Sequence, residues 1–421
     1  MNGIYKLCLC GVMCLFTVAV YCDVYKVTDY HQTGDSSYAE AIGRAITAAD
    51  SNGGGVIYFP PGTYQVHQSI NAKKNLTFEG NSGPGGSSVI QTTGNSAFNL
   101  FTCFNADATN VVFKKLVIDL NNLPGGGLTT GIGIYIHSDT GWNGADSVTG
   151  VIIESCEIKN GTSYGVRGVH TATDYSVPFQ LRIKNCKIHD CILQGICIQR
   201  GTNVVISGSE IYNCDGGAIC LMRGENYVVD SCNIYDIKYH GITICYAKNW
   251  KVVNNTVTKC KLWGICAGGG NPEDPWNTQY VISKNISLEN GCGGITIDPT
   301  IAGQPDFMCS SYGVISKNIC SSSDLYHGIY INHATNMIIK DNICHNNACA
   351  GILAYGQECI IANNIFSSVS PSTSWGIYLT NAATSNAGHI LDQNLIYGTR
   401  PIFIAADLSN VMSSRTENLT P

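Results

Sequence analysis

The chain has 421 residues and a net charge of −6, and only 13% of its residues are charged. Ordinary domains carry roughly 25% charged residues. Low charge with an acidic balance argues against a nucleic-acid-binding surface. The 46 glycines favour instead a solenoid with narrow strands and polar corners.

The first residues predict a secretory signal. A short basic start precedes the apolar segment LCLCGVMCLFTVAVYC at 7–22, and cleavage is expected near Cys22 and Asp23. No later stretch is long and apolar enough to cross a bilayer. We therefore expect residues 1–22 to be a signal peptide, and the protein to be secreted without a membrane span.

Residues 23–54 predict an N-terminal cap that contains an amphipathic helix. Ser37 and Glu40 have the spacing of a capping box at the start of that helix. One face of the helix carries the apolar residues Tyr38, Ala41, Ile42, Ala45, Ile46 and Ala49. The segment GGGVIYFPPGTYQV follows at 53–66.

From the middle of the chain onward, a small residue followed by isoleucine recurs at a nearly constant interval. The first three intervals are 23 residues each, and later ones are 30, 34, 23 and 25. The small residues of these pairs are Gly195, Ala218, Gly241, Gly264, Gly294, Gly328, Gly351 and Gly376. Such a period indicates stacked units that each contact only their neighbours.

Each repeat holds short alternating apolar runs separated by Gly, Asn and Ser, with no run long enough for a helix. Three short strands per turn fit this pattern best. Asparagine directly precedes Ile or Leu at Asn285, Asn318, Asn342, Asn364 and Asn394, which predicts an asparagine ladder at a corner. We expect a single-stranded parallel β-helix of about a dozen turns over 55–407 and a polar tail over 408–421.

This pattern resembles the right-handed parallel β-helix of the pectate-lyase-like superfamily, whose members include polysaccharide lyases, epimerases, glycosidases and phage tailspikes. The resemblance extends over roughly residues 24 to 405 and implies an all-β fold whose open end is covered by the N-terminal helix. No catalytic motif of a specific family is matched. Asp298-Pro299-Thr300 is a faint echo of the Asp-Pro-His of alginate epimerases, so the fold does not give the reaction.

The sequence leaves open whether the cysteines form disulfides or remain free thiols. Equivalent positions on successive turns lie about 4.8 Å apart, which is within the Cα separation of a disulfide. Cys197 and Cys220, or Cys156 and Cys186, therefore have the spacing of a bridge. The alternative is a ladder of free, buried thiols.

Residues that follow each Gly-Ile strand are expected to face outward or to lie at a corner. Three regular turns flanked by longer insertions predict a trough, with Gln199, Arg200, Arg223, Glu225, Tyr246 and Lys248 on its floor and His240 on its flank. Further candidate substrate-binding residues are His170, Trp263, Trp276, His327 and His333. Another column, just before the Gly, holds His240, Trp263, His327 and Trp375.

Arg200 and Arg223 on adjacent turns suggest a bound anion such as the carboxylate of a uronate sugar. The leading hypothesis is action on an extracellular uronate polysaccharide by β-elimination or C5-epimerisation. In it the two arginines neutralise the carboxylate, and His240, Tyr246 or Lys248 transfers the proton. Calcium is the candidate cofactor, held by Glu273, Asp274 and Asp298.

Two alternatives remain. The first is a glycoside hydrolase or fructan-transforming enzyme in which Asp215 and Glu225 form the acid pair. The second is a non-catalytic adhesin or structural spike. The expected partner is a polysaccharide or oligosaccharide, and the protein is expected to be a monomer or a homotrimer.

Overall fold

The computed structural model describes most of the chain between residues 23 and 419. The described ranges are 23–83, 85–138, 148–170, 180–268, 277–298, 310–321, 327–367, 375–380, 388–397, 402–404 and 411–419. The predicted signal peptide therefore lies outside the described residues. No helix in these ranges is both long enough and apolar enough to pass through a membrane.

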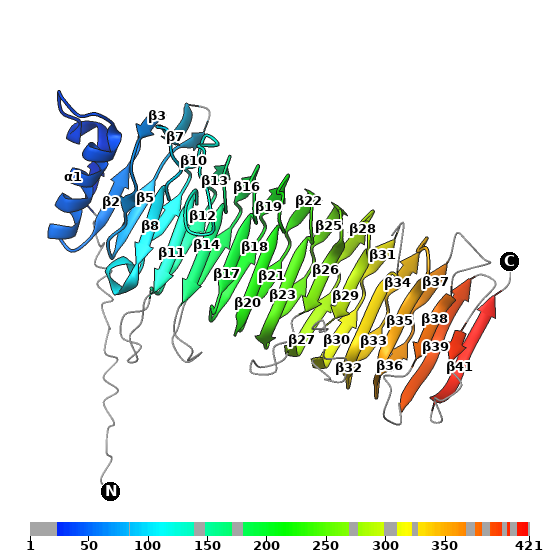
Figure 1. Ribbon diagram of the computed structural model, residues 1–421. Helices are drawn as coiled ribbons and strands as arrows, with labels where there is room; N and C mark the ends of the chain where they lie inside the picture. Colours follow the sequence, from blue (N-terminus) through cyan, green and yellow to red (C-terminus); the bar gives the residue numbers. More distant parts are fainter. Residues whose placement is uncertain are drawn as a thin grey trace, which may run out of the picture.

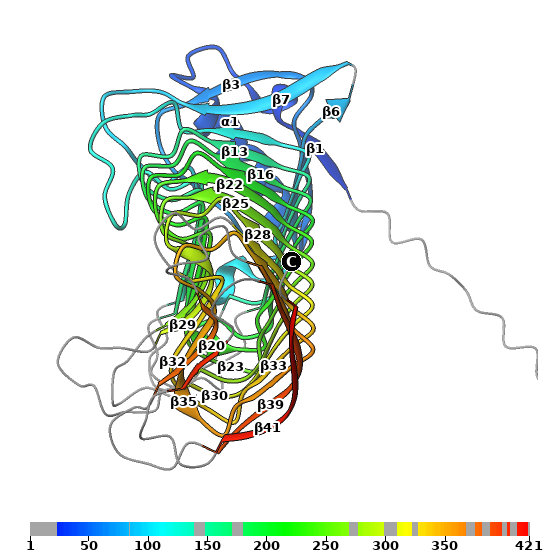
Figure 2. The ribbon, with the colours of Figure 1, turned by 90° about the vertical axis from the view of Figure 1, so that its right-hand side faces the viewer.

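The chain winds into an elongated right-handed coil whose strands pair in parallel with those of the next turn (Figure 1). Seen along the coil in Figure 2, the turns superpose and enclose one continuous interior. The strands form three walls, which we call face 1, face 2 and face 3. The sequence-based prediction of an all-β, single-stranded parallel β-helix is confirmed.

Face 1 begins each regular turn and carries the Gly-Ile repeat. Its strands are β4 (Ile70–Asn71), β8 (Phe101–Phe104), β11 (Ile134–Ser138), β14 (Val166–His170), β17 (Ile196–Gln199), β20 (Ile219–Glu225), β23 (Ile242–Lys248), β26 (Trp263–Gly268), β29 (Gly293–Asp298), β32 (Ile329–Thr335), β35 (Ala350–Gln357), β38 (Trp375–Thr380) and β40 (Ile402–Ile404).

Face 2 follows after a short corner. Its strands are β1 (Val24–Lys26), β2 (Gly55–Tyr58), β5 (Leu76–Glu79), β9 (Val112–Lys114), β12 (Val151–Glu154), β15 (Leu181–Lys184), β18 (Val204–Ser207), β21 (Val228–Asp230), β24 (Lys251–Val253), β27 (Asn277–Ser283), β30 (Ser310–Ser316), β33 (Ile338–Lys340), β36 (Ile360–Ala362), β39 (His389–Tyr397) and β41 (Val411–Leu419).

Face 3 completes the turn. Its strands are β3 (Gly62–Val66), β7 (Gly86–Thr92), β10 (Val117–Asp119), β13 (Glu157–Lys159), β16 (Lys187–His189), β19 (Glu210–Tyr212), β22 (Asn233–Ile237), β25 (Thr256–Cys260), β28 (Ile286–Leu288), β31 (Ile319–Ser321), β34 (Ile343–His345) and β37 (Ile365–Ser367). The short β6 (Ser82–Gly83) pairs antiparallel with β7.

One end of the coil is covered by α1 (Tyr38–Ser51), as Figure 1 shows. The predicted capping box is present: the Ser37 hydroxyl accepts a hydrogen bond from Ala39 N (3.1 Å), and the Glu40 carboxylate accepts one from Ser37 N (3.2 Å). Ile42 and Ile46 are buried against the first turns. Two 3₁₀ helices, η1 (Val27–Tyr30) and η2 (Asn105–Ala108), complete the helical segments described.

The predicted asparagine ladder lies inside the corner between faces 2 and 3. The backbone N–H and the Nδ2 of Asn285 both donate to Oδ1 of Asn318 at 3.0 Å, and Asn318 repeats the pattern with Asn342. Each Nδ2 also donates to a backbone carbonyl of the previous turn, for example Asn318 to Ile282 O at 3.0 Å. Because these groups are buried, the ladder satisfies donors that would otherwise be costly.

The cysteines described in the structure are free thiols. Cys156, Cys186 and Cys232 occupy the ladder positions of earlier turns and are 2% exposed or less. Of the two alternatives left open by the sequence, the structure therefore has the ladder of buried thiols.

The last strand, β41, pairs in parallel with β39. It lies inside the segment predicted to be a polar tail, so the paired coil extends past residue 407.

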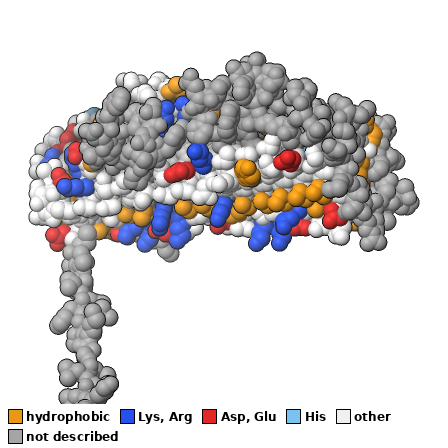
Figure 3. Space-filling model, turned by 90° about the horizontal axis from the view of Figure 1, so that it is seen from below, with side chains coloured by type: hydrophobic (Ala, Val, Ile, Leu, Met, Phe, Trp, Pro, Cys, Tyr) orange, Lys and Arg blue, Asp and Glu red, His pale blue; other side chains and the backbone are white. Residues whose placement is uncertain are grey.

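On the face shown in Figure 3, apolar side chains form a row along the coil, and basic and acidic side chains are interspersed beside them.

Candidate functional site

Face 1 presents its outward side chains in columns, because equivalent residues of successive turns are in register. We define a first column, just before the Gly-Ile pair, that runs through Trp263, Gly293, His327, Ala350 and Trp375. A middle column, between the two inward-facing residues, runs through Cys266, Thr296, Tyr330, Leu353 and Tyr378. In the first column, large side chains alternate with Gly and Ala.

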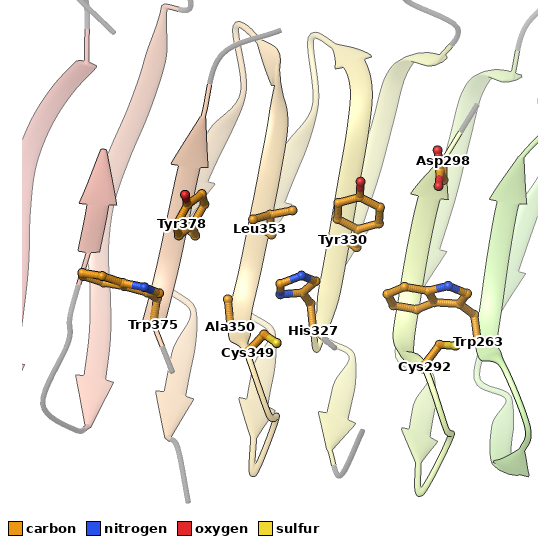
Figure 4. Close-up of a pocket in the computed structure, with 10 residues that line it drawn as sticks. All are labelled: Trp263, Cys292, Asp298, His327, Tyr330, Cys349, Ala350, Leu353, Trp375 and Tyr378. Atoms are coloured by element: carbon orange, nitrogen blue, oxygen red, sulfur yellow. The ribbon is translucent and has the colours of Figure 1, made fainter. Parts of the chain in front are cut away.

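This alternation leaves a pocket of about 540 Å³ on face 1. Trp263 and Trp375 are four turns apart, so the pocket extends over roughly 19 Å at about 4.8 Å per turn. Figure 4 shows the first column below and the middle column above it. The described lining residues are Trp263, Cys292, Asp298, His327, Tyr330, Cys349, Ala350, Leu353, Trp375 and Tyr378.

Gly293 allows the Trp263 ring to lie flat against the coil. A Cβ at this position would be 2.3 Å from Trp263 Cζ3 and 2.2 Å from the backbone oxygen of His327. Both distances are shorter than any normal contact, so only glycine fits. The Trp263 ring is therefore positioned by the missing side chain on the next turn.

His327 is at the centre of the pocket, midway between the two tryptophans in the first column. Burial lowers its pKa to about 4, because the charged imidazolium loses solvation. Its ring centroid is 5.6 Å from that of Tyr330, and the Tyr330 and Trp263 rings are nearly parallel at 5.9 Å. At neutral pH His327 is uncharged and able to accept a proton.

Asp298 ends β29 at the edge of the pocket. One of its carboxylate oxygens accepts a hydrogen bond of 2.9 Å from Asn332 Nδ2. Within the described ranges, no group of three His, Cys, Asp or Glu side chains is arranged to hold a metal ion. Asp298 and Asn332 alone supply too few oxygen ligands for Ca²⁺, which takes six to eight. The other two predicted ligands, Glu273 and Asp274, lie outside the described residues.

His240 belongs to the same column as Trp263, one turn before it. Its Nδ1 accepts a hydrogen bond of 3.2 Å from the Trp263 backbone N–H, and burial lowers its pKa to about 4. The structure thus groups His240 with the tryptophan column, not with the arginines.

Arg200, Arg223 and Tyr246 follow one another on adjacent turns, as predicted, at the corner between faces 1 and 2. All three have left-handed backbone angles, with φ of 60°, 53° and 54°. The Arg223 guanidinium lies 5.5 Å from the centroid of the Tyr246 ring. A strand of face 1 separates this corner from His240 by roughly 15 to 20 Å. The structure therefore does not bring the predicted arginines and the predicted histidine base into one site.

The acid pair proposed for hydrolysis is also separated. Asp215 precedes β20 and pairs with Lys238 Nζ at 2.7 Å, whereas Glu225 ends β20 beside Lys248 of the next turn. The strand between them, β20, spans about 20 Å at about 3.3 Å per residue. Retaining and inverting glycosidases need their carboxyl groups about 5 to 10 Å apart, so this geometry does not support Asp215 and Glu225 as a pair.

The remaining predicted residues are dispersed or undescribed. Gln199 ends β17, in register with Met222 on the adjacent strand. His170 and His333 lie on β14 and β32, but only their backbones are described. Trp276 lies outside the described residues.

Sequence reasoning missed Tyr330 and Tyr378. Both occupy the middle position of an apolar-x-apolar strand, Ile329-Tyr330-Ile331 and Ile377-Tyr378-Leu379. Strand alternation directs these side chains outward, so the signal was present in the repeat. The prediction placed the site three residues further along, at the corner.

Three family models match parts of the chain, and none covers half of it. "Right handed beta helix region" matches residues 133–303, "Rhamnogalacturonase A/epimerase, pectate lyase-like" matches 24–109, and "Periplasmic copper-binding protein (NosD)" matches 274–416. A comparison with curated protein sequences gives no significant match.

Solved structures with the same fold have low sequence identity to this chain. The A-module of mannuronan C-5 epimerase AlgE4 from Azotobacter vinelandii is 18% identical with a TM-score of 0.65, covering 93% of this chain and 100% of that one. A GH87 α-1,3-glucanase catalytic unit from Streptomyces thermodiastaticus is 15% identical (TM-score 0.51, 94% and 68% covered). The Streptococcus pneumoniae surface protein and adhesin PfbA is 16% identical (TM-score 0.58, 85% and 100% covered).

At these identities the structural matches show the fold alone, and the neighbours have different activities. The expected resemblance is nevertheless confirmed by the coil, its N-terminal cap and the matched family models together. The chain therefore folds as a right-handed parallel β-helix and resembles the pectate-lyase-like superfamily over the residues that the first two family models match.

Proposed function

We propose that this protein is secreted and acts on an extracellular uronate-containing polysaccharide, which binds along face 1 between Trp263 and Trp375. In this proposal His327 removes the C5 proton of a bound uronate, and the reaction ends in epimerisation or β-elimination. The observation that carries the proposal is an uncharged histidine at the centre of an aromatic pocket long enough for an oligosaccharide.

The aromatic side chains support sugar binding. The indole of Trp263 and the phenol ring of Tyr330 are nearly parallel, with an interplanar angle of 14°. Aromatic faces bind the apolar C–H faces of sugar rings, and a tyrosine side chain adds a polar hydroxyl at the end of its ring.

An anionic substrate would itself strengthen the base. A carboxylate entering beside His327 stabilises the imidazolium and raises its pKa from about 4 toward neutrality. His327 would therefore become a better proton acceptor only when a uronate is bound. Tyr330, next to it, is the candidate acid that returns a proton in epimerisation.

One observation favours a second candidate, carbohydrate binding without turnover. The ten described lining residues include one acid, Asp298, and no Lys or Arg. β-Elimination and epimerisation both need the substrate carboxylate to be neutralised, and here only hydrogen-bond donors are supplied. The adhesin among the structural neighbours has the same fold without a stated catalytic activity.

The test is to incubate the protein with polymannuronate, polyguluronate, polygalacturonate and a neutral glucan. Proton NMR detects epimerised residues, and ultraviolet absorbance detects the unsaturated uronate left by elimination. Turnover of one uronate polymer supports the first candidate, and binding without turnover supports the second. New reducing ends without unsaturation would indicate hydrolysis and contradict both candidates.

A further inference from the structure

Two thiols of face 1 lie side by side, apart from the aromatic pocket. Cys197 on β17 is in register with Cys220 on β20, so their Cα atoms are about 4.8 Å apart. That separation is within the range that a disulfide requires. Both cysteines are free thiols at outward positions of their strands; Cys197 is 6% exposed and packs in a small apolar cluster, and Cys220 is partly buried against it.

A cation lies next to Cys197. Arg167 on β14 is in register with Cys197, and its guanidinium lies 4.8 Å from the centroid of the Tyr164 ring. Nε and Nη1 of Arg167 are buried and have no hydrogen-bond partner among the described residues. A guanidinium in this position stabilises a neighbouring anion, and a thiolate at Cys197 is within its reach.

The two thiols differ in how readily they ionise. The hydrogen bond from the Cys220 thiol lowers the pKa of Cys197, and the Arg167 charge lowers it further. The same hydrogen bond raises the pKa of Cys220 well above its usual value, as do burial and the thiols of Cys245 and Cys266. Among the described residues, the titratable groups facing the pair are Arg167, Tyr164, Cys245 and Cys266.

We propose that Cys197 and Cys220 form a redox-active dithiol, in which Cys197 is the nucleophile and Cys220 the resolving thiol, and that they close to a disulfide on meeting a small disulfide. The Cys197 thiolate attacks one sulfur of R–S–S–R, which forms a mixed disulfide and releases the first RS⁻. Cys220 then loses its proton to solvent and attacks the Cys197 sulfur, which releases the second RS⁻. Two electrons pass from the protein to the small disulfide.

The chain contains a matched control pair. Cys320 and Cys344 are also in register on adjacent turns, but they point into the core and are 0% and 1% exposed. Burial, and then the hydrogen bond with Cys320, raise the pKa of Cys344 well above its usual value. We therefore expect Cys320 and Cys344, which lie in the main core without a neighbouring cation among the described residues, to stay reduced.

The test treats the reduced full-length protein with hydroxyethyl disulfide at pH 7, followed by peptide mapping without reductant. We expect a cross-link between Cys197 and Cys220, reduced Cys320 and Cys344, and a melting temperature several degrees higher. Cys220→Ser should trap the mixed disulfide on Cys197, and Cys197→Ser should leave Cys220 unmodified.

The role of Arg167 is tested in the Cys220→Ser background. Arg167→Gln should slow modification of Cys197 at pH 7 about tenfold and move the midpoint of its pH profile upward, whereas Arg167→Lys should retain most of the rate. Circular dichroism checks that each variant is folded. A folded Cys220→Ser protein with unmodified Cys197, a cross-link at Cys320 and Cys344 instead, or an Arg167→Gln pH profile like that of the parent would overturn the proposal.

Discussion

At the scale of single residues, His327 is the side chain on which the proposed proton transfer depends. Its ring is half-buried, midway between two tryptophans in the first column, and its pKa is lowered to about 4 by lost solvation. Replacing His327 by a side chain of similar size that cannot take up a proton should abolish proton transfer and leave sugar binding in place. Glutamine meets this condition, because its amide forms hydrogen bonds as histidine does but is not basic.

We therefore expect His327→Gln to reduce turnover of a uronate polymer by about 10²- to 10⁴-fold, while the affinity for oligosaccharide changes little. Steady-state kinetics and calorimetric binding measure the two effects. His345→Gln, on face 3, is the control and should match the parent. Equal turnover in the two variants would remove His327 from the mechanism.

Gly293 gives a second prediction at this scale. A methyl group there would lie 2.3 Å from the Trp263 ring, so Gly293→Ala should displace the indole and weaken oligosaccharide binding by roughly tenfold, or about 1.4 kcal/mol. Gly43→Ala is the control, because a methyl group at that position on α1 would have no atom within 4 Å apart from its chain neighbours and the backbone of its own helix. Unchanged binding and Trp fluorescence in Gly293→Ala would show that Trp263 is not a sugar contact.

At the scale of elements, the ladder between faces 2 and 3 determines how the turns stack. Asn318 accepts two hydrogen bonds from Asn285 and donates to Asn342 and Ile282. Its truncation would leave the Asn285 backbone N–H buried without a partner.

Asn318→Ala should therefore lower the free energy of unfolding by about 1–3 kcal/mol. Asn233→Ala, at an exposed position of β22, should change it by less than about 0.5 kcal/mol. Urea denaturation followed by circular dichroism compares the two. A difference near zero would mean that the ladder contributes no net stability.

Structural elements could be predicted from the sequence where a residue type in a given spacing has a single structural role. Asn285 and Asn318 were correctly placed in a ladder, because a corner Asn must bond to the next turn. Ser37 and Glu40 were correctly placed in a capping box, because their spacing matches N-cap and N3. Cys156 and Cys186 were left between two alternatives, since spacing alone does not set the oxidation state.

The site was harder to predict, because it depends on how far apart the columns are across a face. Arg223 and Tyr246 were correctly placed on adjacent turns, and Trp263 and His327 in one column. The sequence does not show that the arginine corner and the histidine column lie at opposite edges of face 1. It also does not show that Gly293 and Ala350 open space between the larger side chains.

At the scale of the whole molecule, two half-buried histidines couple stability to pH. Burial lowers the pKa of His240 and His327 to about 4, whereas an unfolded chain has His near 6.5. The unfolded state therefore binds more protons between pH 4 and 6.5, and stability rises with pH across this window. The contribution is full above pH 6.5 and is lost as pH falls toward 4.

We expect the melting temperature to fall between pH 6.5 and pH 4, with a loss of up to about 3 kcal/mol for each histidine. The double variant His240→Gln/His327→Gln should show a flatter profile over the same window. Differential scanning calorimetry at several pH values measures both proteins. Parallel profiles would indicate that other groups determine the acid sensitivity.

A crystal structure with a bound oligouronate would show whether sugar binds along face 1 between Trp263 and Trp375. We expect sugar rings against both indoles, with a carboxylate-bearing ring beside His327. Sugar bound at the Arg200 and Arg223 corner, with the aromatic pocket empty, would contradict it.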